Sequence, residues 1–331
     1  MDTALAGTET PEKFEAAVAR ATQFLAHGEV VALPTETVYG LAADATRPDA
    51  VVKIFEAKER PFFDPLIVHL PDRDWLEKVA AIPATSRATV DALIEKFWPG
   101  PLTLVLPRRA LVPDLVTAGL ETVAVRMSAH PVFRAVLERF GKPLAAPSAN
   151  RFGRISPTAA DHVLAELGGR IPLVVDGGAT AHGIESTIVK IDGDRLQILR
   201  SGPVTKEQFS IFNFQFSIAG AARVEAPGQL PSHYAPRTRL RVAQTSSLCA
   251  ETQTGSLRHT GLLAFHTASA GFDAVEVLSP TGDLREAAAT LFAKLRRLDE
   301  AGLDLIVAES VPEHGLGVAI MDRLRKAATR G

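Results

Sequence analysis

The 331-residue chain contains a single cysteine, Cys249, and almost no excess of charge of either sign. One cysteine excludes an internal disulfide and any metal site built from several cysteines, which fits a reducing, cytosolic setting. Lysine and arginine total 36 against 38 aspartate and glutamate residues, for a formal net charge of -2. A free-standing nucleic-acid-binding protein is usually more basic, so we expect any contact with nucleic acid to be local or transient.

Targeting and membrane-spanning patterns are also missing. No uninterrupted apolar run approaches the length of a membrane span. Asp2, Glu9 and Glu12 occupy the N-terminal stretch with no apolar core before them, so we expect no signal peptide. The expectation is a soluble, cytoplasmic protein without a membrane partner.

The familiar phosphate-binding loops and covalent catalytic motifs do not occur. Gly141-Lys142 lacks the upstream glycine of a P-loop, and Gly315-Leu316-Gly317 lacks the third glycine of the dinucleotide fingerprint. No Ser-His-Asp order, His-Glu-x-x-His motif or cysteine nucleophile stands out. Hydroxyls and cations at predicted strand ends suit the positioning of reactants and the stabilisation of charge better than covalent catalysis.

The apolar periodicity predicts a first domain, residues 1–205, of alternating helices and strands. Several strands follow one another without a helix, which favours a mixed, twisted sheet with flanking helices over a purely parallel one. Start and stop signals predict helices over about 10–27, 48–60, 85–98, 131–140 and 156–167. Apolar runs predict strands at 30–33, 66–70, 102–106, 122–126, 144–146, 173–175, 186–191 and 196–199.

The remainder divides into a connecting segment and a second domain. Residues 206–238 have no sustained period and end in a proline-rich, semi-rigid strap, Pro231 through Pro236. The phenylalanines at 209, 212, 214 and 216 suggest that part of this segment packs back onto a domain. Residues 239–331 predict a small Rossmann-like α/β domain, with strands at 240–242, 262–265, 274–278 and 303–308 and helices at 283–298 and about 318–328.

The loop that follows the first buried strand is the first candidate site. Thr35, Glu36 and Thr37 lie between Pro34, which ends the strand, and Gly40. Two hydroxyls beside a carboxylate on a rigid strand-end loop suit a small polar ligand. The same residues are equally compatible with an ordinary capped turn.

Cations and one histidine give further candidates. Lys58 and Arg60, at the end of a predicted helix, are placed to clamp phosphate oxygens, although a solvated basic helix terminus explains them as well. Arg126 ends an apolar strand and, if buried, needs an anionic partner, for which a ligand carboxylate would serve. His69 sits in an apolar strand, where a histidine is usually a satisfied core residue.

Two further segments offer hydroxyls and amides. Ser148, Asn150 and Ser156 lie within nine residues, and Ser156-Pro157 has the signature of a helix N-cap followed by a first-turn proline. Ser156 is therefore either an N-cap or part of an anion site. Ser186 opens a strand after a glycine-rich turn, where turn chemistry alone is also sufficient.

Taken together, these motifs resemble the YrdC-like family. The matching segments are collinear over about the first 200 residues: Pro34–Leu41, Lys58-x-Arg60-Pro61, Pro65–His69, Trp98–Thr103, Thr122–Arg126, Pro147–Asn150, Ser156–Thr158, Glu185–Thr187 and Arg200–Gly202. The strap with His233-Tyr234-Ala235-Pro236 and a following domain resembles the longer, two-domain branch, the threonylcarbamoyl-AMP synthases.

The resemblance implies a transferase, more narrowly a nucleotidyltransferase. It implies that L-threonine, bicarbonate or CO2, and ATP are converted to L-threonylcarbamoyladenylate and pyrophosphate, with Mg2+ as cofactor and metal ligands unknown. It further implies that a downstream threonylcarbamoyl transferase machinery uses the product to form threonylcarbamoyladenosine next to the anticodon of tRNA.

The resemblance also assigns roles to residues. It implies that threonine is held by Thr37, His69, Arg126 and Ser186, with Arg126 pairing its carboxylate. It implies that ATP is held by Lys58, Arg60, Asp64, Thr122, Ser148, Asn150, Ser156, Arg200 and Tyr234. Lys58 and Arg60 would stabilise charge, and Tyr234 in the strap would close over the nucleotide. Asp64 stands where the family often has asparagine, which puts that ATP contact in doubt.

Two alternatives remain open at this point. One is a non-catalytic module of the same fold that binds RNA, against which the near-neutral charge argues. The other is a carbamoyl transferase that acts on a different acceptor.

Overall fold

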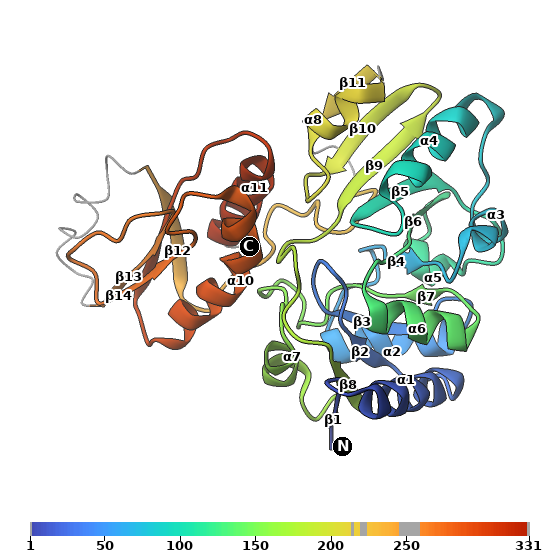
Figure 1. Cartoon of the computed structure of the whole chain (residues 1–331), viewed down its shortest axis with the longest axis horizontal. Helices are drawn as coiled ribbons and strands as arrows, with labels where there is room; N and C mark the ends of the chain where they lie inside the picture. Colours follow the sequence, from blue (N-terminus) through green and yellow to red (C-terminus); the bar gives the residue numbers. More distant parts are fainter. Residues whose placement is uncertain (1, 213–214, 219–223, 245–258, 330–331) are drawn as a thin grey trace. The chain divides into compact units, whose positions relative to one another are not determined.

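The computed structural model describes residues 2–212, 215–218, 224–244 and 259–329, which form two compact units. The first unit comprises residues 1–152, 157–181 and 185–229, and the second comprises 153–156, 182–184 and 230–331 (Figure 1). Cys249 and Phe214 lie outside the described residues.

The first unit contains eleven described strands and a set of helices and 3-10 turns. The strands are β1 (Ala4–Gly7), β2 (Val31–Leu33), β3 (Gly40–Asp44), β4 (Ile67–His69), β5 (Leu102–Pro107), β6 (Thr122–Arg126), β7 (Leu144–Ala145), β8 (Leu173–Asp176), β9 (Thr187–Asp192), β10 (Arg195–Arg200) and β11 (Gln215–Ile218). The helices are α1 (Pro11–Ala26), α2 (Pro48–Lys58), α3 (Leu76–Val79), α4 (Arg87–Phe97), α5 (Asp114–Thr117), α6 (Pro131–Phe140), α7 (Ala160–Leu167) and α8 (Lys206–Phe209). Three 3-10 turns complete it: η1 (Arg73–Trp75), η2 (Ala84–Ser86) and η3 (Ser210–Phe212).

The strands join in the order β1-β8-β2-β3-β7-β4-β6-β5-β9-β10-β11. Parallel pairs such as β4 with β6 alternate with antiparallel pairs such as β2 with β3 and β5 with β6. The sheet is therefore mixed, and the predicted fold class is confirmed. Antiparallel neighbours are possible because several connections are too short to cross back over the sheet.

Both faces of the sheet are covered. Val31 and Leu33 face a core shared with α1 and α6, which lie side by side in Figure 1, whereas Ala32 between them faces the opposite core with α2, α4 and α7. This alternation follows from the period of two along a strand. It explains why the strand sequences are apolar throughout rather than alternating with polar residues.

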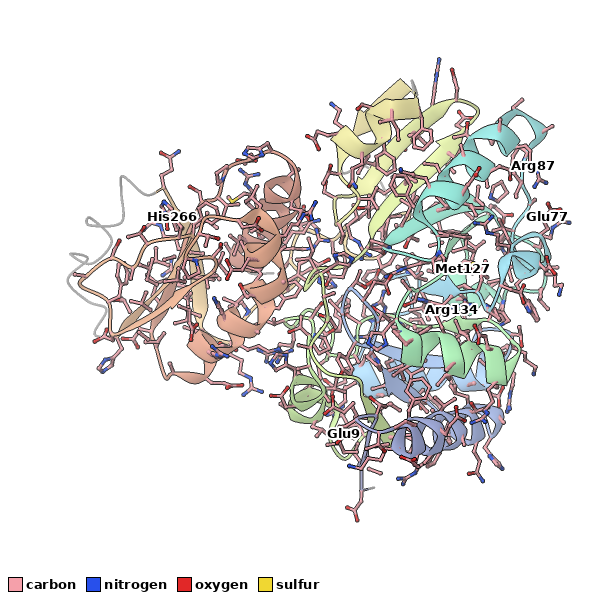
Figure 2. All side chains as sticks on the ribbon, viewed as in Figure 1. Glu9, Glu77, Arg87, Met127, Arg134 and His266 are labelled. Carbon is pink, nitrogen blue, oxygen red and sulfur yellow. The ribbon has the colours of Figure 1, made fainter. Side chains whose placement is uncertain are left out.

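The helices begin where the sequence signals place them in most cases. Thr10 accepts a hydrogen bond from the Lys13 N–H and precedes Pro11, as predicted for an N-cap and a first-turn proline. Surface charges pair between helices, as between Arg87 on α4 and Glu77 on α3, whose atoms are 2.7 Å apart (Figure 2). The predicted helix over 85–98 is preceded by the 3-10 turn η2 and becomes α-helical only at Arg87.

One predicted helix start is wrong. Helix α7 begins at Ala160 with Ala159 at its N-cap, so Ser156 does not cap it. The Pro157 carbonyl accepts the Tyr39 N–H, and the Thr158 carbonyl accepts the Thr180 N–H. Because these carbonyls are hydrogen-bonded to two other segments, the helix begins later than the Ser156-Pro157 signal predicts.

The second unit has a four-strand, fully parallel sheet in the order β12-β15-β13-β14. Its elements are β12 (Arg239–Ala243), β13 (Thr260–Ala264), β14 (Ala274–Val277), α10 (Leu284–Glu300), β15 (Leu305–Glu309) and α11 (Leu316–Ala328). Asp283 caps α10 by accepting the N–H groups of Arg285 and Glu286. Among the described residues, none of the helices is long and apolar enough to cross a membrane.

Candidate active site

The loop between β2 and β3 is held in shape by one hydroxyl. Thr35 Oγ1 accepts the N–H groups of Thr37 and Val38 at 3.1 and 3.2 Å and lies 2.7 Å from the Val38 carbonyl oxygen. Leu33 and Gly40 pair at the base of the loop, so it closes tightly. Thr35 is therefore fully engaged within the turn, while Glu36 and Thr37 project toward β6.

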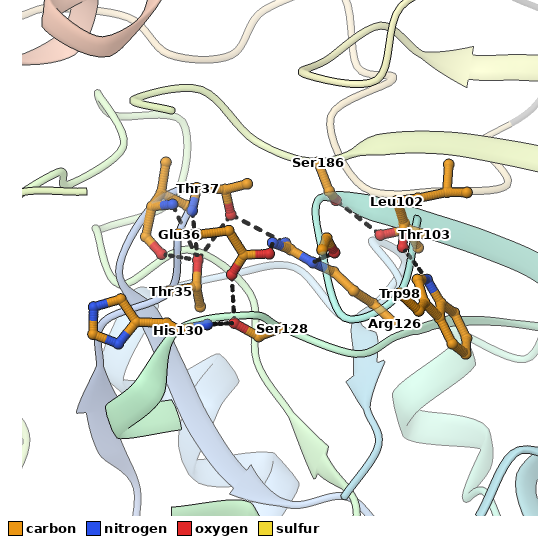
Figure 3. A network of polar contacts seen from close by, with 12 residues as sticks. Thr35, Glu36, Thr37, Trp98, Leu102, Thr103, Arg126, Ser128, His130 and Ser186 are labelled. Atoms are coloured by element: carbon orange, nitrogen blue, oxygen red, sulfur yellow. Dashed lines mark hydrogen bonds and ion pairs between the residues drawn. The ribbon is translucent and has the colours of Figure 1, made fainter. Parts of the chain in front are cut away.

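Arg126 is the centre of the first cluster of polar groups (Figure 3). It ends β6, and its side chain is 3% exposed. The guanidinium donates from Nη2 to Glu36 Oε1 at 2.6 Å, from Nη1 to Thr37 Oγ1 at 3.0 Å and from Nε to the Gly100 carbonyl at 3.1 Å. A buried arginine does need an anionic partner, and in this structure Glu36 supplies it.

Glu36 is itself fixed from a second side. Ser128 Oγ donates to Glu36 Oε2 at 2.5 Å, and Ser128 Oγ accepts the His130 N–H at 3.3 Å. Burial, the largest influence on this carboxyl, works against ionisation, but Arg126 and the Ser128 hydrogen bond outweigh it and lower the pKa of Glu36 to about 2. Glu36 is a carboxylate throughout the physiological pH range.

His69 ends β4 and lies directly beside Arg126 in the parallel register of β4 and β6. Its ring packs 4.7 Å from the Phe133 ring, and its Nδ1 has no hydrogen-bond partner among the described residues. Burial and then the adjacent Arg126 lower the pKa of His69 to about 3. The imidazole is therefore neutral and not the satisfied core histidine that such a position usually holds.

A second cluster joins β5, β9 and β10. Ser186 Oγ lies 2.8 Å from Thr103 Oγ1, as Figure 3 shows, and accepts from Arg200 Nη2 at 3.0 Å. Arg200 also donates to the Ser186 carbonyl at 3.0 Å and to the Pro227 carbonyl at 3.2 Å. Ser186 thus lies between a strand hydroxyl and a buried cation.

Lys58 connects the end of α2 with the segment that follows β7. Its buried ammonium donates to the Ser148 carbonyl at 2.6 Å and to the Asn150 carbonyl at 2.5 Å. Burial and then the neighbouring Arg60 hold the pKa of Lys58 well below its usual value, against the opposing effect of Asp64. These contacts show that Lys58 is not a solvated helix terminus.

Arg60 and Asp64 form a buried ion pair on the adjoining loop. Arg60 Nη2 lies 2.8 Å from Asp64 Oδ2 and donates to the Pro65 carbonyl at 2.9 Å. Neither Asp64 oxygen accepts a geometrically aligned hydrogen bond from the described residues. Burial raises the pKa of Asp64, although Arg60 and, after it, Lys58 and Arg200 oppose that shift.

Three predicted site residues are not members of these clusters. Thr122 begins β6, four residues before Arg126, and pairs with Pro107 of β5. Ser156 and Tyr234 belong to the second unit. Tyr234 has a left-handed backbone with φ of 64°, and its ring stacks 5.6 Å from Phe292 with the Arg323 guanidinium 5.1 Å from its centre.

Sequence reasoning did not single out Ser128 or Thr103 as site residues. Ser128 completes the Glu36 contact from a position two residues after Arg126, and Thr103 follows the Trp98-Pro99-Gly100-Pro101 segment. Ser128 could have been identified from the sequence because it places a hydroxyl two residues after Arg126, an arginine at a strand end.

Comparisons with known proteins agree over nearly the whole chain. A family model described as "Telomere recombination" (Sua5, YciO and YrdC) matches residues 23–202, and one described as the C-terminal domain of threonylcarbamoyl-AMP synthase matches 196–329. A threonylcarbamoyl-AMP synthase of Bacillus subtilis is 44% identical, with 94% of this chain and 92% of the relative covered. One of Pyrococcus abyssi is 40% identical, with 93% of each chain covered.

Solved structures agree as well. The crystal structure of P. abyssi Sua5 complexed with L-threonine matches with a TM-score of 0.89 and 37% identity, over 99% of this chain and 98% of that chain. Escherichia coli YciO, at 18% identity and a TM-score of 0.50, covers 60% of this chain and 94% of its own and shares the fold of the first unit. The chain carries both domain models in order and is similar along its length to the two-domain relatives; it belongs to the Sua5/YciO/YrdC family, in the branch of the threonylcarbamoyl-AMP synthases.

Proposed function

We propose that this chain is a threonylcarbamoyl-AMP synthase acting in the cytoplasm. It would convert L-threonine, bicarbonate or CO2, and ATP to L-threonylcarbamoyladenylate and pyrophosphate. The observation that carries the proposal is the buried Arg126, set between Glu36, Thr37 and His69, in a chain that matches a relative complexed with L-threonine over its full length.

Threonine recognition would centre on Arg126. The described residues use three of the five N–H groups of its guanidinium, which leaves two for a ligand carboxylate. Thr37, Ser186 and the neutral His69 would supply the remaining contacts to the amino acid. Each of these groups is held by its strand or loop before any ligand arrives, which reduces the entropic cost of binding.

ATP would be held mainly by the cations around Asp64. Lys58, Arg60 and Arg200 are buried on separate elements, and all three shift the Asp64 titration. Such a set can neutralise a triphosphate, with further contacts from Asp64, Thr122, Ser148 and Asn150. Ser156 and Tyr234 of the second unit are also proposed to contact ATP.

Mg2+ is expected to arrive bound to the triphosphate. The described residues include no group of three or more His, Cys, Asp or Glu side chains that could enclose a metal ion. Asp64, a buried carboxyl without aligned hydrogen bonds, fits as a single protein oxygen donor beside phosphate oxygens. The ion would supply charge neutralisation on the phosphates.

The chemistry needs no protein nucleophile. The threonine amine forms a bond to the carbon of CO2 and loses a proton, which gives a carbamate. A carbamate oxygen then attacks the α-phosphorus of ATP, and the bond to the β-phosphate bridge breaks to release pyrophosphate. Lys58 and Arg60 would stabilise the leaving charge, and exclusion of water would protect the labile carbamate.

The product would feed tRNA modification. Threonylcarbamoyladenylate is an activated carbamate, so a downstream threonylcarbamoyl transferase would pass the threonylcarbamoyl group to an adenosine next to the anticodon. Contact of this chain with tRNA itself would be weak, in line with a net charge of -2.

Pyrophosphate release with each substrate omitted in turn tests the proposal. We expect release from ATP only when threonine and bicarbonate are both present, because the carbamate is the nucleophile. Release that is indifferent to threonine would refute the substrate assignment. Salt-dependent RNA binding without ATP turnover would favour the binding-module alternative.

A further inference from the structure

The two charged groups that contact each other at Arg126 balance. Glu36 and Arg126 carry opposite charges with their atoms 2.6 Å apart. His69 lies beside Arg126 in the register of β4 and β6, and burial holds its pKa below the usual value. His130, at the start of α6, donates its backbone N–H to Ser128 while its ring points away from the pair (Figure 3). At neutral pH the pair is therefore one anion and one cation beside the neutral His69 ring, and the next cation, Arg200, donates to Ser186 of the second cluster.

The ion pair is built into the fold before a ligand binds. Ser128 fixes one Glu36 oxygen, and Thr37 together with the Gly100 carbonyl fixes Arg126 from two other directions. Glu36 keeps 10% of its side-chain surface exposed, against 3% for Arg126. A ligand that reaches Arg126 therefore meets the Glu36 carboxylate as well.

We infer that Glu36 determines the charge type of the ligand: it balances the Arg126 charge at the carboxylate end of the amino-acid subsite, so that the site selects a zwitterion over a simple carboxylic acid. This inference rests on the proposed function, because it takes Arg126 as the partner of the threonine carboxylate. The ammonium of an amino acid offsets the Glu36 charge while its carboxylate pairs with Arg126. An acid without the amine brings a second anion beside Glu36 with nothing to balance it.

The test compares two ligands that differ only in the amine, L-threonine and 3-hydroxybutanoate. Their binding to the full chain without ATP is measured by calorimetry, with competition for the weaker ligand. In the Glu36→Gln variant we expect the preference for threonine to fall by about tenfold or more, the scale of a charge contact at a partly shielded site. Most of the change should be tighter binding of 3-hydroxybutanoate to the uncompensated Arg126.

Two variants serve as controls. Glu138→Gln removes a 63% exposed carboxylate from another arginine pair, with Arg134 on α6 (Figure 2), and should leave the preference unchanged. Glu36→Asp keeps the charge and should retain most of the preference. A preference that stays within twofold in Glu36→Gln, or falls as far in Glu36→Asp, would overturn the inference.

A measurement on the unaltered protein covers the case in which Glu36→Gln does not fold. The inference predicts that the unaltered protein binds 3-hydroxybutanoate about tenfold or more weakly than threonine, because the acid lacks the ammonium that offsets Glu36. Equal affinities for the two ligands would contradict the inference. Absence of threonine binding to the unaltered protein would instead refute the proposed function, so the two failures are distinguishable.

Discussion

At the scale of single residues, the candidate threonine site depends on the ion pair between Glu36 and Arg126, which are 90 positions apart in the chain. The sequence places Arg126 at the end of an apolar strand, where it requires an anionic partner if it is buried, and the structure shows that it is buried. The sequence does not identify Glu36 as that anion, because no local periodicity connects a loop after β2 with the last residue of β6. Only the pairing of strands brings the two together.

The pH dependence of stability tests this pair. Glu36 has an ordinary pKa of 4.5, which is the value expected in the unfolded chain, and about 2 in the folded chain. A lowered folded pKa contributes stability above the unfolded value and loses it as pH falls from about 5 toward 2. The contribution at neutral pH is about 3 kcal/mol.

We therefore expect the unaltered protein to exceed Glu36→Gln in free energy of unfolding by that order at pH 7. The gap should narrow steeply by about pH 3, as measured by urea unfolding at each pH. The same comparison with Glu138→Gln should show a small gap at both pH values, since that pair is exposed. If the difference in unfolding free energy between the unaltered protein and Glu36→Gln did not change with pH, Glu36 would not have a lowered pKa in the folded protein.

At the scale of elements, the loop between β2 and β3 is anchored by the turn after β8. Tyr39 donates its hydroxyl to the Gly178 carbonyl at 2.8 Å and accepts the Gly177 N–H at 3.1 Å. The same turn passes close to Pro34, at the start of the loop. The turn at 176–178 thus sets the position from which Glu36 and Thr37 reach Arg126.

Gly177→Ala tests this support. A Cβ atom at Gly177 would lie 2.7 Å from Pro34 Cγ and 2.8 Å from His130 Cε1, so both must shift. We expect a loss of about 1–3 kcal/mol in unfolding free energy from overpacking. Because Pro34 adjoins the loop and His130 holds Ser128, the KM for threonine should also rise severalfold.

Gly178→Ala is the matched control. Gly178 has φ of +81° with no atom within 4 Å of an added Cβ, so alanine there brings only backbone strain of about 1–2 kcal/mol. We expect lowered stability with little change in the threonine KM. An unchanged threonine KM in Gly177→Ala, despite its lower stability, would show that the turn does not position the loop.

Element positions were predictable where signals are local and strong. Strand β6 and helix α6 have the predicted limits, because an apolar run precedes Arg126 and Pro131 and Gly141 flank the helix. The strands β1, β3 and β11 were not predicted, since none of them is an uninterrupted run of large apolar residues. The start of α7 was misplaced because tertiary hydrogen bonds to Pro157 and Thr158 override the Ser156-Pro157 signal.

At the scale of the whole molecule, two units of different sheet type occur in one chain. The first unit, which has the mixed sheet, contains the described contacts of Arg126 and Lys58 and the Arg60–Asp64 pair, and the second unit, which has the parallel sheet, contains the ring contacts of Tyr234. The relatives in Bacillus subtilis and Pyrococcus abyssi match across more than nine-tenths of this chain. The resemblance therefore covers both units and not only the one with the threonine cluster.

The most direct test of the central claim follows carbon from bicarbonate into an adenylate. The full chain is incubated with threonine, ATP, Mg2+ and 13C-labelled bicarbonate, and the adenylates formed are analysed at once by mass spectrometry. We predict threonylcarbamoyladenylate carrying one labelled carbon, formed only with threonine present. Adenylated threonine without the label, or no adenylate at all, would contradict the account.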